Sequence, residues 1–241
     1  MSILKFLYKK QYSLGSAKDK IKIMIPTVGE VLDDEEIYYR LVSLLTAMPI
    51  DLMVQLDDNG IDFTKINDYE LFLNLFGTLK TLDTHLIFGD LDLSNFKYAE
   101  KEGSSSIVLY DPINDIEINR FVHAEIANVL RKIHHIKKNT KTAGNEEARK
   151  YMLERARIKQ KRHKHLVEDS NLESLIVAMV NTKEFKYDFE SVRNLTIFQF
   201  NDSVQQIINK VDYDNRMIGV YSGTINAKDL SQDDLNWLIH K

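Results

Sequence analysis

Hydrophobic residues recur three and four positions apart over most of the chain, which is the spacing of one face of an α-helix. Asn67 with Glu70, and Thr196 with Gln199, stand three positions apart, as in a capping box at a helix start. The predicted helices cover residues 34–58 with a break at Pro49, then 67–79, 119–133, 145–167, 170–179, 196–211 and a short one at 231–238.

A period of two interrupts this pattern in two places. Ile21, Ile23 and Ile25 alternate with less apolar residues and are followed by Pro26, which predicts a short half-buried strand. Four further short runs alternate with turn-forming sequences and predict a small antiparallel meander. These runs are residues 85–88, 93–98, 107–110 and 116–118.

The order of these elements predicts an α+β fold that is predominantly helical. It combines the small antiparallel meander near 85–118 with a long basic helix and a C-terminal helical lobe. The clearest break in the pattern lies at 140–145 and contains Gly144. We therefore expect an N-terminal α+β lobe at 1–140 and a C-terminal helical lobe at 141–241 that begins with the basic helix.

Composition narrows the function classes. The 241 residues are 44% hydrophobic, enough for a sizeable core, and include no cysteine. Disulfide scaffolds, thiolate metal sites and cysteine nucleophiles are therefore excluded. The apolar stretch 37–54 carries Arg40 and Asp51, and residues 1–15 are interrupted by lysines, so we expect neither a membrane span nor a signal peptide. A soluble intracellular protein is expected.

Charge is distributed unevenly along the chain. Residues 131–165 hold 13 of the 32 Lys and Arg residues and only three acids, a formal charge of +10, whereas the remainder carries −14. The overall formal charge of −4 conceals this division. The basic side chains of 155–162 point to several sides of a helix, so this stretch is not expected to be a buried core helix.

Three interpretations of the basic helix remain open. It is an exposed bridging helix, a docking element for an acidic protein surface such as another copy of the chain, or a site for nucleic-acid phosphates. Tyr151 is the one aromatic residue among these bases, which gives little support for stacking on single strands. The candidate partner- or nucleic-acid-binding residues are Arg149, Lys150, Arg155, Arg157, Lys159, Lys161, Arg162 and Lys164.

Catalytic patterns are weak. Asp90 and Asp92 follow an apolar run in the manner of aspartyl phosphatases, but the flanking segments do not alternate strand and helix as that fold requires. His134 and His135 are adjacent and therefore diverge on a helix, and no H-E-x-x-H pattern occurs. We expect a non-enzymatic protein without a cofactor or metal.

The two ends of the chain resemble a known class of proteins. The run Phe189-Glu190-Ser191 through Phe200 leads into a long amphipathic helix, and the chain ends with 223–226 and 235–238. With Ile25-Pro26-Thr27-Val28-Gly29-Glu30 before an acidic helix, this is similar to tail-morphogenesis proteins of tailed bacteriophages, including baseplate-hub assembly factors and tail-assembly chaperones. The resemblance covers about the first 90 and last 50 residues and carries over no functional residues.

The resemblance implies a tail or baseplate structural or assembly protein that acts by protein–protein contacts. Its expected partners are other phage tail or assembly proteins, and a homo-oligomer is a further possibility. It would act in the host cytoplasm or remain in the virion. The alternative is a nucleic-acid-associated adaptor that binds phosphates through the basic helix at 149–165.

Overall fold

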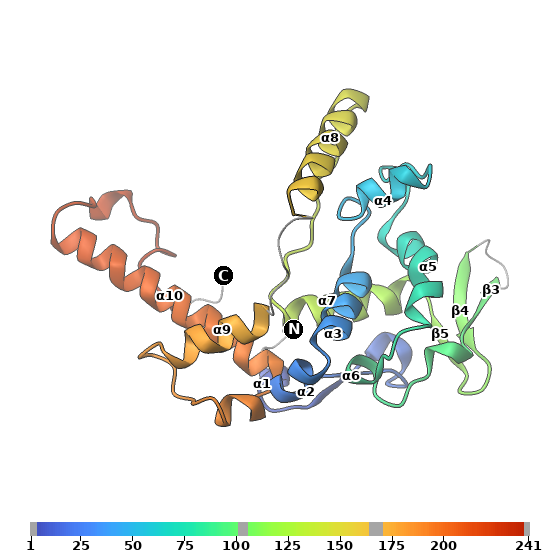
Figure 1. The fold of residues 1–241 in the computed structure, drawn as a ribbon, viewed down its shortest axis with the longest axis horizontal. Coiled ribbons are helices and arrows are strands. Elements are labelled where there is room, and N and C mark those ends of the chain that lie inside the picture. Colours follow the sequence, from blue (N-terminus) through green and yellow to red (C-terminus); the bar gives the residue numbers. More distant parts are fainter. Residues whose placement is uncertain (1–3, 101–105, 164–170, 239–241) are drawn as a thin grey trace.

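The computed structural model describes residues 4–100, 106–163 and 171–238, and it confirms a predominantly helical α+β fold (Figure 1). The α-helices are α1 (Leu4–Leu7), α2 (Val28–Asp33), α3 (Glu35–Thr46), α4 (Met53–Asp58), α5 (Asp68–Leu79), α6 (His85–Phe88), α7 (Arg120–Ile133), α8 (Glu146–His163), α9 (Asn171–Val180) and α10 (Ile197–Tyr221). The strands are β1 (Gln11–Ser13), β2 (Lys22–Met24), β3 (Lys97–Glu100), β4 (Ile107–Asp111) and β5 (Ile116–Ile118). Short 3-10 helices are η1 (Gly15–Ala17), η2 (Leu93–Asn95), η3 (Ser191–Asn194) and η4 (Ala227–Asp229).

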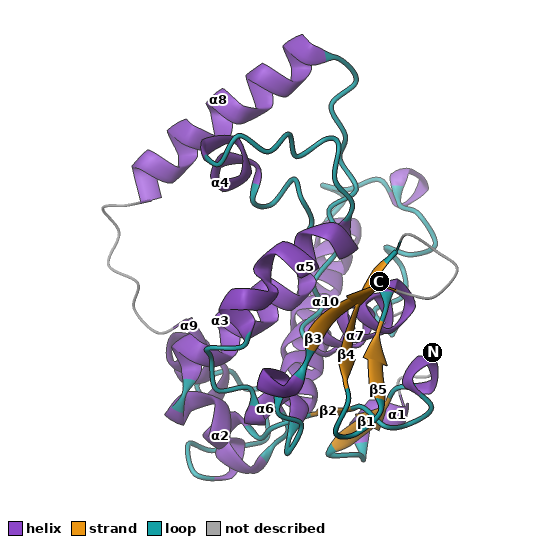
Figure 2. Ribbon diagram, turned by 90° about the vertical axis from the view of Figure 1, so that its right-hand side faces the viewer, coloured by secondary structure: helices purple, strands orange, loops and turns teal. Residues whose placement is uncertain are grey.

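Two small antiparallel sheets contain these strands. The strand predicted around Ile23 is β2, which pairs with β1 so that Tyr12 lies opposite Ile23. The predicted meander is the sheet β3-β4-β5, in which Leu109 lies between Tyr98 and Ile118 (Figure 2). In β5 the half-buried Glu117 stands between the buried Ile116 and Ile118, as expected for a strand with one face on the core.

The meander is shorter than predicted, because residues 85–88 form helix α6 and not a strand. The main-chain N–H groups of Ile87 and Phe88 donate to the Thr84 carbonyl oxygen, which closes a single helical turn. Both side chains are buried. A four-residue apolar run fits a buried helical turn and a buried strand equally well, so its sequence pattern did not distinguish them.

Helix starts agree closely with their sequence signals. Asn67 and Thr196 form complete capping boxes, and the Asn119 side chain caps α7. Helix α2 was not predicted, although Thr27 and Glu30 form a capping box at its start. The predicted start near residue 34 corresponds to the next helix, α3.

The main hydrophobic core runs from Phe6 to Val204 and includes residues from both sides of position 140. Phe6 and Phe198 are both fully buried, and their ring centroids lie 5.3 Å apart. Two main-chain hydrogen bonds also join the N-terminal and C-terminal parts of the chain. One of them runs from Val28 N–H to the Leu195 carbonyl oxygen at 2.8 Å. This core therefore joins the two ends of the chain. The division into lobes at 1–140 and 141–241 stays a prediction.

The end of the described chain differs from the prediction, since residues 231–238 form turns and not a helix. The Asn236 side chain accepts a hydrogen bond from the main-chain N–H of Leu238, a local arrangement that competes with helix formation. This tail (residues 224–238) instead lies along α10, where the Arg216 guanidinium is 2.7 Å from the Asp234 carboxylate.

Candidate interaction surfaces

Helix α8, which contains seven of the eight predicted binding residues, stands out from the body and lies beside α4 (Figures 1 and 2). Asn145 caps its start by accepting a hydrogen bond from Ala148 N–H. Leu153, which is only 6% exposed, and the partly buried Met152 attach the helix to the rest of the protein. Leu153 belongs to a second small hydrophobic cluster, whose other buried members are Ile50, Leu56, Phe63 and Leu71.

Two of the predicted binding residues face acidic side chains of the same chain. The Arg157 guanidinium lies 2.8 Å from a carboxylate oxygen of Asp57 and 2.7 Å from one of Asp58, both in α4. Arg149 lies 2.7 Å from Glu146 and 3.6 Å from Asp57. Hydrogen bonds that Arg157 donates to the carboxylates of Asp58 and Asp57 raise the pKa of Arg157 above its ordinary value. These two arginines therefore orient α8 on α4.

Three other predicted residues lie on the opposite side of α8. Arg155, Lys159 and Arg162 follow Leu153 by two, six and nine positions, so each is rotated by about 120–180° from the anchored face. All three are exposed and have no carboxylate partner within the described part of the chain. The Arg155 guanidinium lies 5.6 Å from the centroid of the Tyr151 ring and donates to its hydroxyl oxygen at 3.0 Å. We call Arg155, Lys159 and Arg162 the outer basic face.

The remaining predicted residues are less informative. Lys150 and Lys161 are exposed on the flank of α8, where Glu154 is also exposed. Lys164 lies outside the described residues. Sequence reasoning missed the acids Asp57 and Asp58, which lie about 100 positions from Arg157. No local pattern in the sequence relates residues so far apart.

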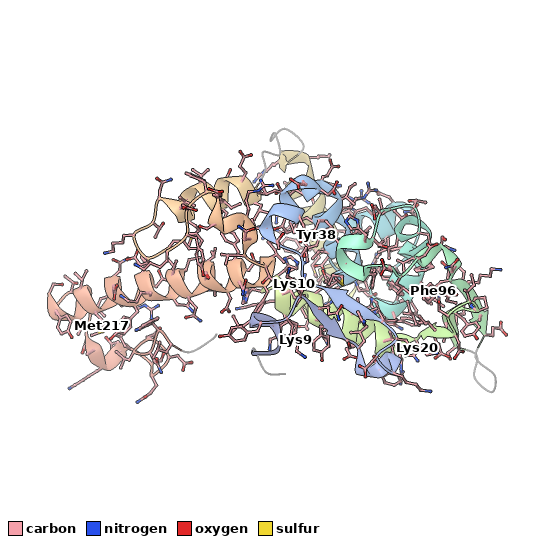
Figure 3. All side chains as sticks on the ribbon, turned by 90° about the horizontal axis from the view of Figure 1, so that it is seen from below. Lys9, Lys10, Lys20, Tyr38, Phe96 and Met217 are labelled. Atoms are coloured by element: carbon pink, nitrogen blue, oxygen red, sulfur yellow. The ribbon has the colours of Figure 1, made fainter. Side chains whose placement is uncertain are left out.

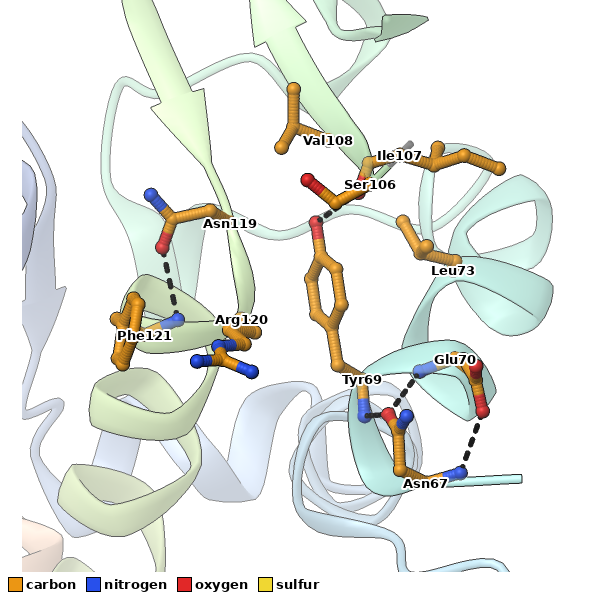
Figure 4. A pocket seen from close by; sticks show the side chains of 10 residues that line it. All are labelled: Asn67, Tyr69, Glu70, Leu73, Ser106, Ile107, Val108, Asn119, Arg120 and Phe121. Carbon is orange, nitrogen blue, oxygen red and sulfur yellow. Dashed lines mark hydrogen bonds between the residues drawn. The ribbon is translucent and has the colours of Figure 1, made fainter. Parts of the chain in front are cut away.

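A pocket of about 660 Å³ lies between the starts of α5, β4 and α7 (Figure 4). Burial raises the pKa of Tyr69 in this pocket to about 12, and its hydroxyl donates to the Ile118 carbonyl oxygen at 2.9 Å. Glu70 and Asn119, which also line it, serve as helix caps. Arg120 and Phe121 also line the pocket, and the Arg120 guanidinium lies 4.6 Å from the centroid of the Phe121 ring. These polar groups stabilise local structure.

Asp92, the second aspartate of the predicted Asp90–Asp92 pair, has a local structural role. The Asp92 carboxylate accepts hydrogen bonds from Ser94 N–H and the Ser94 hydroxyl, both at 2.8 Å, and caps η2. These hydrogen bonds lower the pKa of Asp92. Across 4–100, 106–163 and 171–238, no three His, Asp or Glu side chains are placed to hold one metal ion. Over the same ranges, no helix has the length and apolar character that crossing a membrane requires.

A second surface lies at the far end of α10. The first turns of this 25-residue helix are buried in the core, where Ile197, Phe198 and Phe200 are fully buried. Beyond Val204, every residue of the helix is half-buried or exposed. Figure 3 shows this part, which carries Met217, extending away from the body.

The segment that contains most of these surfaces matches a family model in a comparison with known proteins. The model of the YomV second domain, a phage-derived family, matches residues 159–240. The match begins within α8 and includes α9, α10 and the tail, about a third of the chain. No curated protein and no solved structure matches the chain. The C-terminal third therefore resembles a phage protein, and this likeness is not specific to tails.

Proposed function

We propose that the chain is a non-enzymatic phage protein that acts through protein–protein contacts in tail or baseplate assembly. The observation that carries the proposal is the match of residues 159–240 to a phage-derived family. The resemblance of the chain ends to tail-morphogenesis proteins supports the finer assignment to tails. The host cytoplasm or the assembled particle is the expected location.

The distribution of surfaces is consistent with a protein that binds other proteins. Its core joins α1 to the first turns of α10, and two helices extend from this body with faces that the described chain does not cover. Ile218 on α10 is 65% exposed and Ile158 on α8 is 44% exposed. Exposed apolar side chains on extended helices suit contacts with partner proteins.

Affinity capture tests this function. A tagged full-length chain is expressed together with the neighbouring phage genes, and the bound proteins are identified by mass spectrometry. We expect identified tail or baseplate subunits to be enriched over capture with an unrelated tagged protein of similar size. Failure to enrich any tail or baseplate subunit, with those subunits shown to be expressed, would overturn the proposal.

A second candidate function is that of a nucleic-acid-associated adaptor. The outer basic face of Arg155, Lys159 and Arg162 favours it, because these three cations are not held by α4. Their exposure leaves them available for phosphate contacts, each of which would make the slope of log affinity against log salt more negative by about 0.9.

Duplex DNA binding, followed by fluorescence anisotropy from about 50 mM salt upward, tests this second candidate. Replacing Arg155, Lys159 and Arg162 with Gln should weaken binding and reduce the salt slope. A control triple variant, with Gln at Lys22, Lys65 and Lys183, removes the same charge from exposed positions elsewhere. No binding at the lowest salt, or equal losses in the two variants, would reject the adaptor function.

A further inference from the structure

The outer part of α10 has two different sides. Asn209, Tyr213 and Arg216 line the contact with the tail, where Arg216 pairs with Asp234. A residue two positions along a helix points to nearly the opposite side. Val211 lies two positions from both Asn209 and Tyr213, and Ile218 lies two positions from Arg216, so both point away from the tail.

The side away from the tail is apolar and exposed. Ile208 is 47% exposed, Val211 39%, Ile218 65% and Tyr221 84%. This stripe continues the buried stripe that contains Phe200 and Val204, but it lies beyond the body and no described segment covers it. Val211 and Ile218 lie nearly in line along the helix, and Ile208 and Tyr221 lie about 60° to either side of them. A broad exposed apolar face of this kind is typical of a surface that another helix covers.

The spacing of the stripe points to a second copy of the same helix. Successive intervals between Ile208, Val211, Ile218 and Tyr221 are 3, 7 and 3 residues, the same in both chain directions. In an antiparallel pair with its two-fold axis between positions 214 and 215, Ile208 would meet Tyr221 of the partner subunit. Val211 would likewise meet Ile218 of the partner subunit. Every apolar residue of the stripe would then face an apolar residue.

The polar residues fit the same arrangement. Residues 208–221 contain Lys210, Asp212, Asp214 and Arg216, which carry no net charge, so two copies do not repel each other. At the two-fold axis, Asp214 would face Asn215 of the partner subunit, and the amide could donate to the carboxylate. A polar pair at one layer of a helical interface fixes its register.

The direction of pairing follows from the position of the body. Helix α10 leaves the body near Val204 and extends away from it (Figures 1 and 3). Parallel pairing would bring two bodies to the same end of the interface, where they would compete for space. Antiparallel pairing places them at opposite ends. We propose that residues 208–221 of α10 form an antiparallel two-helix interface with a second copy of the chain.

This interface does not depend on the proposed function. It presents few side chains, so the dimer should dissociate readily, with a dissociation constant in roughly the micromolar range. A chain that dimerises in this way but captures no tail subunit would overturn the proposed function alone. Capture of tail subunits by a strictly monomeric chain would overturn the interface alone.

Sedimentation velocity of the full chain over a range of about 5 to 500 μM tests the association. We expect the wild-type chain to shift from monomer to dimer, and the variant Ile218→Asp to remain monomeric with an unchanged helical circular dichroism spectrum. Ile113→Asp introduces the same change at a 74% exposed position in the β4–β5 turn and should dimerise normally. A monomeric wild-type chain, or equal dimerisation of Ile218→Asp, would overturn the proposal.

Disulfide trapping tests the direction, and the chain has no native cysteine to interfere. Antiparallel pairing brings position 208 next to position 221 of the other copy. We therefore expect a mixture of Ile208→Cys and Tyr221→Cys chains to form a mixed disulfide on mild oxidation, and each variant alone to form far less. Efficient crosslinking of Ile208→Cys with itself would indicate parallel pairing and overturn the antiparallel interface.

Discussion

The guanidinium of Arg157 lies 2.8 Å from a carboxylate oxygen of Asp57, across the contact between α8 and α4. Both side chains are about one-third exposed. The carboxylate of the adjacent Asp58 also contacts the Arg157 guanidinium. Part of the positive charge of the basic helix is therefore matched within the same chain. The charge that remains available to a partner is concentrated on the opposite side, at Arg155, Lys159 and Arg162.

Replacing Arg157 with Gln should loosen α8 from α4 without unfolding the body. Exposed ion pairs contribute little to overall stability, but this one fixes the orientation of a helix that has few other contacts. Hydrogen exchange measured by mass spectrometry should become faster in α8 and stay unchanged in α7. Arg155→Gln, on the far side of the same helix, should leave exchange unchanged, and similar acceleration in both variants would contradict the assignment.

Leu153→Ala should weaken the attachment of α8 more strongly. The side chain is 6% exposed in the small cluster with Ile50, Leu56, Phe63 and Leu71, and its truncation should cost about 2 kcal/mol. Because this cluster is separate from the main core, the loss should appear in the opening free energy of α8 and α4, measured by hydrogen exchange. Ile158→Ala, at a 44% exposed position, is the control and should have little effect.

Local sequence signals predicted most of the fold. The capping boxes at Asn67 and Thr196 and the cap at Asn119 each depend on residues within three positions, so the sequence alone places these helix starts. The antiparallel meander was also predicted, because turn-forming residues separate its short runs. The failures at 85–88 and 231–238 are short segments where several conformations satisfy the same pattern.

Contacts between distant segments could not be predicted in this way. The hydrogen bond between Val28 and Leu195 and the ion pair between Arg157 and Asp57 join residues that no periodic pattern relates. The sequence identified α8 as a candidate surface, but only the structure separates its anchored side from its outer basic face. The exposure of the α10 stripe likewise depends on where the core ends, and helical periodicity alone does not show that position.

Stability should fall as the pH decreases from about 6.5 toward 4. Burial, together with the nearby His135, lowers the pKa of His134 from 6.5 to about 4, and burial lowers that of His123 to about 4. Between these values the unfolded chain binds protons that the folded chain does not bind, so acidification favours unfolding. Each histidine should reduce the free energy of unfolding by roughly 1.4 kcal/mol per pH unit within this window.

Urea unfolding at pH 7 and pH 5 measures this dependence. His134→Gln should reduce the loss of stability between the two pH values, whereas His85→Gln, at an exposed side chain, should not. The His134 ring lies 3.0 Å from the Tyr38 hydroxyl, so the variant will also lower stability at pH 7, and the comparison is made between slopes. A free energy of unfolding that is the same at both pH values would contradict burial of neutral histidines.

Two glycine-to-alanine substitutions should have opposite effects on stability. A Cβ at Gly29 would lie 3.2 Å from the main-chain carbonyl oxygen of Arg193, where α2 packs against η3, so Gly29→Ala should destabilise the protein by about 1 kcal/mol. Gly77 lies within α5 with no atom within 4 Å of the added carbon, so Gly77→Ala should stabilise it by about 0.5–1 kcal/mol. Thermal unfolding of both variants measures the difference. If both substitutions raise the midpoint temperature of thermal unfolding, then α2 does not approach η3 as closely as the structure indicates.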